Sequence, residues 1–198
     1  MAIQYDSETA LLVVDVQNDF ADPNGSLYVQ GGEDVVPVIN AEIAAARSAG
    51  AHVVYTADWH PESTPHFARD GGVWPVHCVG DTWGAAFHPN LIVDGPVVRK
   101  GTGGEDGYSG FSVRDPESEQ VAATGLADQL ERWGVKTIVV CGLATDYCIK
   151  ATSLDGTAGG YNVVVLAAGV RAVNLEPGDG DRALAEIFAA GCQIVEAT

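Results

Sequence analysis

The sequence has 198 residues and a formal net charge of −17, with 46% hydrophobic and 19% charged residues. This negative charge repels phosphate backbones and anionic membrane surfaces, which argues against nucleic-acid and membrane partners. No apolar run approaches the ~20 residues that span a bilayer, and the first ten residues lack the pattern of a secretory signal. We therefore expect one globular domain over residues 1–198, located in the cytoplasm. In that compartment the four cysteines are expected to be reduced thiols.

Short apolar runs alternate with helix-type segments along the chain. The pattern predicts, in order, a strand at 10–14, a helix at 33–49, strands at 51–57 and 96–99, a helix at 119–133, a strand at 136–141, a helix at 145–157, a strand at 161–167, a helix at 179–190 and a strand at 192–196. Continuously apolar strands are typical of a parallel sheet covered on both faces. The predicted fold class is therefore α/β, a three-layer α/β/α sandwich.

The predicted helix at 119–133 and the long segment 58–95 differ in how regular their apolar pattern is. In the second predicted helix, Val121, Leu126 and Leu130 are expected on the buried face. The segment 58–95 has no sustained periodicity and is rich in proline, tryptophan and histidine. A loop of this length is usually functional or disordered, and its tryptophans argue against disorder. We interpret it as a functional loop insertion in the domain.

Reactive side chains follow four of the predicted strands. Asp15 ends the first strand, Asp58 and His60 follow the second, Lys100 ends the third, and the segment 142–148 follows the fourth. Because the carboxyl ends of parallel strands share one edge of a sheet, where ligands bind in open α/β folds, we expect these groups to meet. The sequence therefore predicts an active site at this edge.

Three of these groups suit nucleophilic catalysis. Cys148 lies where a helix is expected to begin, so backbone N–H groups and the helix dipole would favour a thiolate and could receive an oxyanion; a buried, inert thiol is the alternative. Asp15 is either a proton carrier or a strand-end cap. Lys100 either keeps both partners charged or is an ordinary exposed lysine. Together the three would supply a nucleophile, a proton shuttle and a cation.

The segment 58–67, DWHPESTPHF, suggests a metal site. Asp58, His60 and His66 form a ligand set that suits Zn²⁺, Fe²⁺ or Mn²⁺, and His77 could be a fourth ligand. The spacing is not a unique signature, so a polar loop with capping histidines is the alternative.

Six motifs occur in order: DVQNDF at 15–20, GSLYVQGGE at 25–33, DWHPESTPHF at 58–67, WPVHC at 74–78, KGTGGEDGYSGF at 100–111 and GLATDYCIKAT at 142–152. Taken jointly, they resemble the isochorismatase-like cysteine hydrolases, and within them the nicotinamidase (pyrazinamidase) branch, over nearly the whole chain. The resemblance implies a three-layer α/β fold with a mostly parallel six-stranded sheet. Two departures, the acidic glycine-rich segment 101–107 and the variable position Tyr147, concern fine substrate preference.

The resemblance also implies roles for individual residues. The implied catalytic triad is Asp15, Lys100 and Cys148. A cis peptide at Leu143–Ala144 is implied to turn the amides of Ala144 and Cys148 into an oxyanion hole. The residues implied to line a pocket for a flat ring are Phe20, Trp74 and Tyr108. The implied ligands of one divalent metal ion, with zinc preferred over iron or manganese, are Asp58, His60, His66 and His77.

The implied activity is hydrolysis of nicotinamide to nicotinate and ammonia in NAD salvage, through a cysteine thioester, with pyrazinamide as a further substrate. The expected partner is a small carboxamide, and a homo-oligomer is an assembly the sequence allows. One alternative is another cysteine amidase of this fold that acts on carbamoyl or ureido groups. Others are a metallohydrolase in which Cys148 is incidental and a non-catalytic binding protein. The histidine cluster favours a pyridine ligand over carbamoyl substrates.

Overall fold

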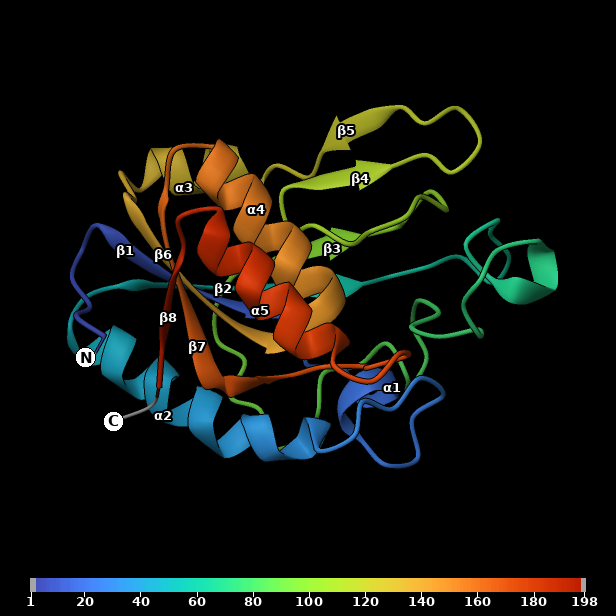
Figure 1. Cartoon of the computed structure of the whole chain (residues 1–198), viewed down its shortest axis with the longest axis horizontal. Coiled ribbons are helices and arrows are strands. Elements are labelled where there is room, and N and C mark those ends of the chain that lie inside the picture. Colours follow the sequence, from blue (N-terminus) through green and yellow to red (C-terminus); the bar gives the residue numbers. More distant parts are fainter. Residues whose placement is uncertain (1–2, 197–198) are drawn as a thin grey trace.

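A six-stranded parallel sheet forms the centre of the protein. In the computed structural model, which describes residues 3–196, the strand order is β3-β2-β1-β6-β7-β8, and each neighbouring pair is parallel (Figure 1). The strands are β1 (Thr9–Val14), β2 (His52–Asp58), β3 (Val97–Lys100), β6 (Thr137–Leu143), β7 (Asn162–Arg171) and β8 (Gln193–Val195). The predicted parallel sheet and its six strands are confirmed.

Helices cover both faces of this sheet. The helices are α1 (Asn18–Ala21), α2 (Val35–Ser48), α3 (Leu126–Arg132), α4 (Lys150–Ala158) and α5 (Asp179–Ala189), with 3-10 turns η1 (Gly32–Asp34) and η2 (Ala68–Asp70). In β1, Leu11 and Val13 pack with α2, whereas Leu12 and Val14 pack with the layer that contains α3 and α5. Because both faces of β1 are buried, its sequence is continuously apolar.

Two predicted helices differ from the expectation, one in length and one in the type of its first turn. The helix predicted over 119–133 begins only at Leu126, because residues 121–123 form β5 (Val121–Ala123), which pairs antiparallel with β4 (Ser112–Arg114). Val121, predicted on a buried helix face, is 68% exposed. The helix predicted over 145–157 begins instead with a π-helical turn, η3 (Thr145–Ile149), which continues into α4.

Hydrogen bonds, rather than regular structure, fix much of the long segment between β2 and β3. The Gln17 side chain donates to the carbonyls of Asp58 and Ala85 and accepts from the Asp58 N–H. Asp19 accepts from the backbone N–H group of Cys78. These contacts tie the loop to the chain that follows β1, so the loop lies beyond the carboxyl ends of the central strands (Figure 1).

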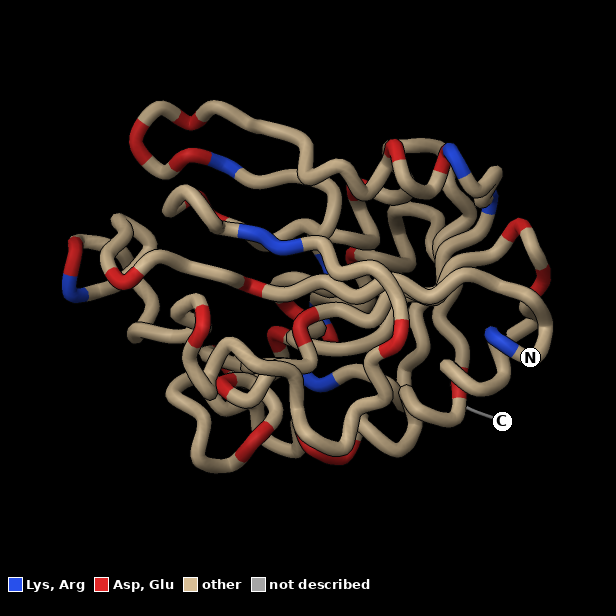
Figure 2. The backbone as a smooth tube through the Cα atoms, turned by 180° about the vertical axis from the view of Figure 1, so that it is seen from behind, with Lys and Arg blue, Asp and Glu red and all other residues tan. Residues whose placement is uncertain are grey.

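The surface of the protein is acidic, with 27 Asp and Glu residues against 10 Lys and Arg residues. The acidic positions are spread over several loops and helices rather than gathered on one element (Figure 2). Within residues 3–196, no helix combines the length and apolar character needed to cross a membrane.

Candidate active site

Asp15, Lys100 and Cys148 meet at the carboxyl edge of the sheet. Asp15 directly follows β1 with a φ of 50°, Lys100 ends β3, and Cys148 lies in η3 after β6. The Lys100 Nζ lies 2.7 Å from Asp15 Oδ2 and 3.8 Å from Cys148 Sγ. A carboxylate oxygen of Asp15 lies within 4.8 Å of the Cys148 sulfur. All three side chains are buried, so the structure brings together the predicted acid, cation and thiol.

Lys100 also contacts Asp58, which the sequence predicts only as a metal ligand. Its Nζ lies 2.6 Å from Asp58 Oδ1 and donates to the carbonyl of Gly107. Burial acts to lower the pKa of Lys100, but attraction to Asp15 and Asp58 outweighs burial and raises this pKa well above its usual value. Lys100 is therefore a buried cation shared between two carboxylates.

Burial also shifts the two proton-transfer groups. It raises the pKa of Asp15 to about 6, although Lys100 acts in the opposite direction. Thr56 Oγ1 donates to Asp15 Oδ1 at 2.5 Å, which also lowers this pKa. Burial raises the pKa of the Cys148 thiol well above its usual value, against the attraction of Lys100. This raised pKa disfavours the thiolate that a helix start was expected to favour, so a base is needed to ionise the thiol.

The turn that carries Cys148 is fixed by backbone and side-chain contacts. The peptide between Leu143 and Ala144 is cis, as the resemblance implies. The Asp146 carboxylate accepts hydrogen bonds from the backbone N–H groups of Val173 at 2.9 Å and Asn174 at 2.8 Å. The role of the Ala144 and Cys148 amides as an oxyanion hole stays a prediction.

Three histidines form a second buried cluster near the same edge. One ring nitrogen from each of His60, His66 and His77 lies within 4.8 Å of the others. His66 Nδ1 hydrogen-bonds to Asp106 Oδ1 at 2.6 Å, and His77 Nδ1 to the Pro75 carbonyl at 2.7 Å. In each of these rings, Nε2 is the nitrogen left for a ligand.

His60 supplies the test of whether a metal ion fits. Both of its ring nitrogens are buried and lack a hydrogen-bond partner, a costly arrangement that a bound ion would relieve. Burial lowers its pKa to about 4, which keeps the ring neutral, the form that binds metals. Asp58 Oδ2 lies 3.9 Å from His60 Nε2. Three imidazoles beside one carboxylate suit zinc or a similar divalent metal.

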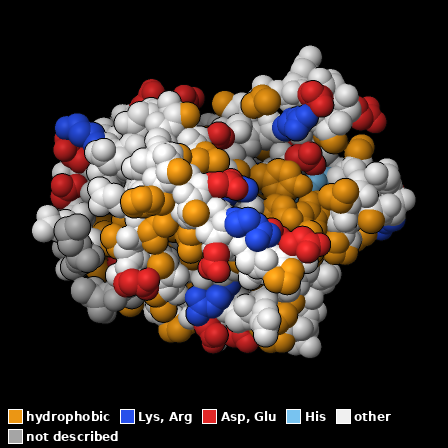
Figure 3. All heavy atoms as spheres, viewed as in Figure 1, with side chains coloured by type: hydrophobic (Ala, Val, Ile, Leu, Met, Phe, Trp, Pro, Cys, Tyr) orange, Lys and Arg blue, Asp and Glu red, His pale blue; other side chains and the backbone are white. Residues whose placement is uncertain are grey.

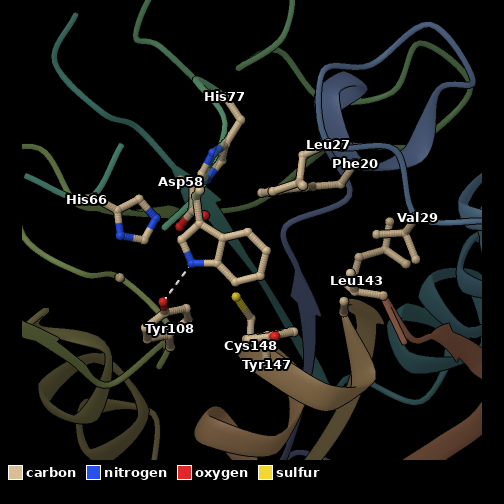
Figure 4. Close-up of a pocket in the computed structure, with 14 residues that line it drawn as sticks. Phe20, Leu27, Val29, Asp58, His66, His77, Tyr108, Leu143, Tyr147 and Cys148 are labelled. Carbon is tan, nitrogen blue, oxygen red and sulfur yellow. Dashed lines mark hydrogen bonds between the residues drawn. The ribbon is translucent and has the colours of Figure 1, made fainter. Parts of the chain in front are cut away.

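A cavity connects the thiol to the histidines. Figure 4 shows Asp58, His66 and His77 at one end and the Cys148 sulfur near the middle. The cavity is lined by all three residues implied to hold a ring: Phe20, Trp74 and Tyr108. Trp74 Nε1 donates to the Tyr108 hydroxyl at 2.8 Å (Figure 4).

Sequence reasoning missed other wall residues. They are Leu27, Val29, Leu143 and Val173. Tyr147, singled out as a variable position, also lines the cavity and makes an edge contact with Trp74. Figure 3 shows apolar side chains gathered beside a histidine over this end of the molecule.

The parallel α/β fold, with a buried thiol, acid and lysine at its carboxyl edge, is the arrangement of a hydrolase with an open α/β sheet. The model of the Isochorismatase domain matches residues 9–198, and the chain belongs to this family. It is 37% identical to a nicotinamidase of Escherichia coli K12, over 93% of each chain.

Two solved structures are similar to the whole chain. PnC1 from L. infantum, in complex with nicotinate, is 34% identical with a TM-score of 0.88, and the match covers 99% of this chain and 96% of that one. The pyrazinamidase of Pyrococcus horikoshii, in complex with zinc, is 40% identical with a TM-score of 0.84 and coverage of 96% and 99%.

Proposed function

We propose that this protein is a nicotinamidase, which hydrolyses nicotinamide to nicotinate and ammonia and also accepts pyrazinamide. The observation that carries this proposal is one aromatic-lined cavity that holds a histidine cluster at one end and, near its middle, a thiol beside a carboxyl group of raised pKa. A pyridine carboxamide has an electrophilic amide carbon, which suits the thiol, and a ring nitrogen, which suits the histidine cluster. The similarity to nicotinamidases, and to structures with nicotinate and with zinc, supports this function.

In the proposed reaction, Asp15 takes the proton of Cys148, and the thiolate adds to the amide carbon. The Ala144 and Cys148 amides stabilise the oxyanion. Asp15 then gives its proton to the nitrogen as the C–N bond breaks and ammonia leaves. Such general-acid help contributes about 10²–10⁴-fold to the rate. Asp15 next deprotonates a water that adds to the thioester, and it returns this proton to the Cys148 sulfur as the C–S bond breaks. Nicotinic acid leaves and ionises to nicotinate.

The buried contacts of Lys100 suit proton transfer between Asp15 and Cys148. Its positive charge stabilises Asp15 as a carboxylate and Cys148 as a thiolate, each of which burial otherwise disfavours. The cation thus lowers the free-energy cost of both charged side chains without forming or breaking a covalent bond itself.

We further propose that Asp58, His60, His66 and His77 hold one divalent metal ion, with zinc preferred over iron or manganese. An ion held by these residues would supply a Lewis acid for a pyridine nitrogen, which is a templating role. Phe20, Trp74 and Tyr108 hold the flat ring between them. The chemistry of amide cleavage stays with Asp15 and Cys148.

The test is ammonia release from nicotinamide, compared with N-carbamoyl substrates, on metal-quantified protein before and after chelation. We expect turnover of nicotinamide, complete loss in Cys148→Ala with metal retained, and near-normal turnover in Cys192→Ala, which removes a buried thiol elsewhere. Activity that survives Cys148→Ala but not His60→Ala would show that the thioester scheme is wrong. Turnover of carbamoyl substrates alone would instead support the alternative amidase.

A further inference from the structure

The carboxylate of Asp106 touches the histidine cluster without belonging to the predicted ligand set. Its Oδ1 lies 2.6 Å from His66 Nδ1. The Asp106 side chain is 24% exposed, whereas that of His66 is 5% exposed, so the carboxylate reaches the cluster from its outer side. The proposed reaction makes no use of this residue.

The position of Asp106 is set by the β4–β5 hairpin. The Asp106 N–H donates to the Arg114 carbonyl at 2.8 Å, and the Arg114 N–H donates to the Asp106 carbonyl at 2.9 Å, which forms an antiparallel bridge next to the hairpin. Ser112 Oγ donates to Asp155 Oδ2 at 2.9 Å and so anchors the hairpin to α4. The Asp106 backbone is therefore fixed to the hairpin, and the hairpin is in turn fixed to α4.

A histidine binds a metal ion through one ring nitrogen, and the contact at the other nitrogen fixes the tautomer and the orientation of the ring. If Asp106 accepts a hydrogen bond from Nδ1–H of His66, the lone pair available to a ligand is on Nε2. Figure 4 shows the second ring nitrogen of His66 on the side that faces Asp58 and His77.

We propose that Asp106 is a positioning residue of the metal site, which holds His66 as the Nδ1–H tautomer with Nε2 directed at the ion and thereby sets the affinity for the ion. This inference rests on the metal site proposed above. His77 has the equivalent contact from a backbone carbonyl, that of Pro75, which no side-chain substitution removes. Asp106 is therefore the outer contact that mutation can test.

The experiment measures zinc retention by the zinc-loaded full chain in competition with a chromogenic chelator. Asp106→Ala should weaken zinc binding about 10–100-fold, the usual cost of losing such a contact. Asp106→Asn should bind more tightly than Asp106→Ala, since its amide oxygen can accept the same hydrogen bond. Glu105→Gln is the matched control: it removes one negative charge from the neighbouring residue, whose side chain accepts a hydrogen bond from the Gly103 N–H, and it should leave the zinc affinity unchanged.

A second readout separates positioning from a general loss of structure. In ¹⁵N-labelled, metal-free protein, long-range ¹H–¹⁵N correlations should show the Nδ1–H tautomer at His66 and its loss in Asp106→Ala. Equal zinc affinity of Asp106→Ala and wild type would overturn the proposal, as would equal losses in Asp106→Ala and Glu105→Gln. A wild-type chain that holds no zinc would mark failure of the metal site itself, and this inference would fall with it.

Discussion

Replacing Lys100 by methionine tests the charge balance of the active site. Methionine fills a similar volume but removes the cation that lies 2.7 Å from Asp15 and 2.6 Å from Asp58, all in a buried setting. Removing one partner of a buried ion pair costs about 3–5 kcal/mol, because the remaining charge is uncompensated. Since two carboxylates share this lysine, we expect the free energy of unfolding at pH 8 to fall by at least this ~3–5 kcal/mol.

The loss should depend on pH. Without the lysine, the folded-state pKa values of Asp15 and Asp58 should rise well above the unfolded value of about 4. The folded state then binds more protons than the unfolded state, so stability falls as pH rises from about 4 through the raised pKa values. Asp15, whose pKa is already about 6 with Lys100 present, should shift further upward. The deficit of the variant should therefore be smaller at pH 5 than at pH 8.

Urea unfolding of the metal-free proteins, followed by tryptophan fluorescence at both pH values, measures this deficit. Lys136→Met is the control, because Lys136 pairs with Glu8 at the surface, where both side chains are more than half exposed, and its loss should change stability little. A Lys100→Met deficit no larger than that of Lys136→Met, or one that is equal at pH 5 and pH 8, would refute the reasoning.

Two further predictions concern catalysis. Thr56→Val removes the donor that lowers the pKa of Asp15, so the acidic limb of the kcat/KM profile for nicotinamide should move upward from about pH 6 by about one unit; an unchanged limb would count against Asp15 as the base. Tyr108→Phe removes the acceptor for Trp74 Nε1, so KM should rise about fivefold, from a contact worth ~1 kcal/mol, with little change in kcat. Equal KM values in steady-state assays would show that this contact does not support ring binding.

The central strands β1, β2 and β6 could be predicted because a strand buried on both faces must be apolar throughout. The β4–β5 hairpin could not, since each of its strands has only three residues and none of them is buried. Val121 therefore looked like one more apolar position at helical spacing, although its backbone pairs with Arg114 across the hairpin. In such short exposed strands the pairing partner, rather than the local pattern, determines the structure.

The meeting of Asp15, Lys100 and Cys148 could also be predicted, because topology alone brings strand ends to one edge. The contact between Lys100 and Asp58 could not: it depends on the register that places these residues opposite each other in β2 and β3. The hydrogen bond from Thr56 to Asp15 likewise follows from the β1–β2 register, in which Thr56 pairs with Val14. The raised pKa of Cys148 could not be predicted either, because it results from the burial of the thiol, and the spacing of residues in the sequence does not indicate how deeply a side chain is buried.

Trp74 lies between His66 and His77 in the sequence, and its backbone N–H and carbonyl bond to the His66 carbonyl and the Ala68 N–H. The same stretch of chain therefore carries two of the expected metal ligands and one wall of the ring pocket. An ion that orders residues 66–77 at the metal site therefore also orders Trp74 at the ring pocket. Thermodynamic linkage requires that a bound ring has the same effect on the affinity for the ion. Ion and carboxamide are thus expected to act as each other's effectors, each raising the affinity for the other by the same factor.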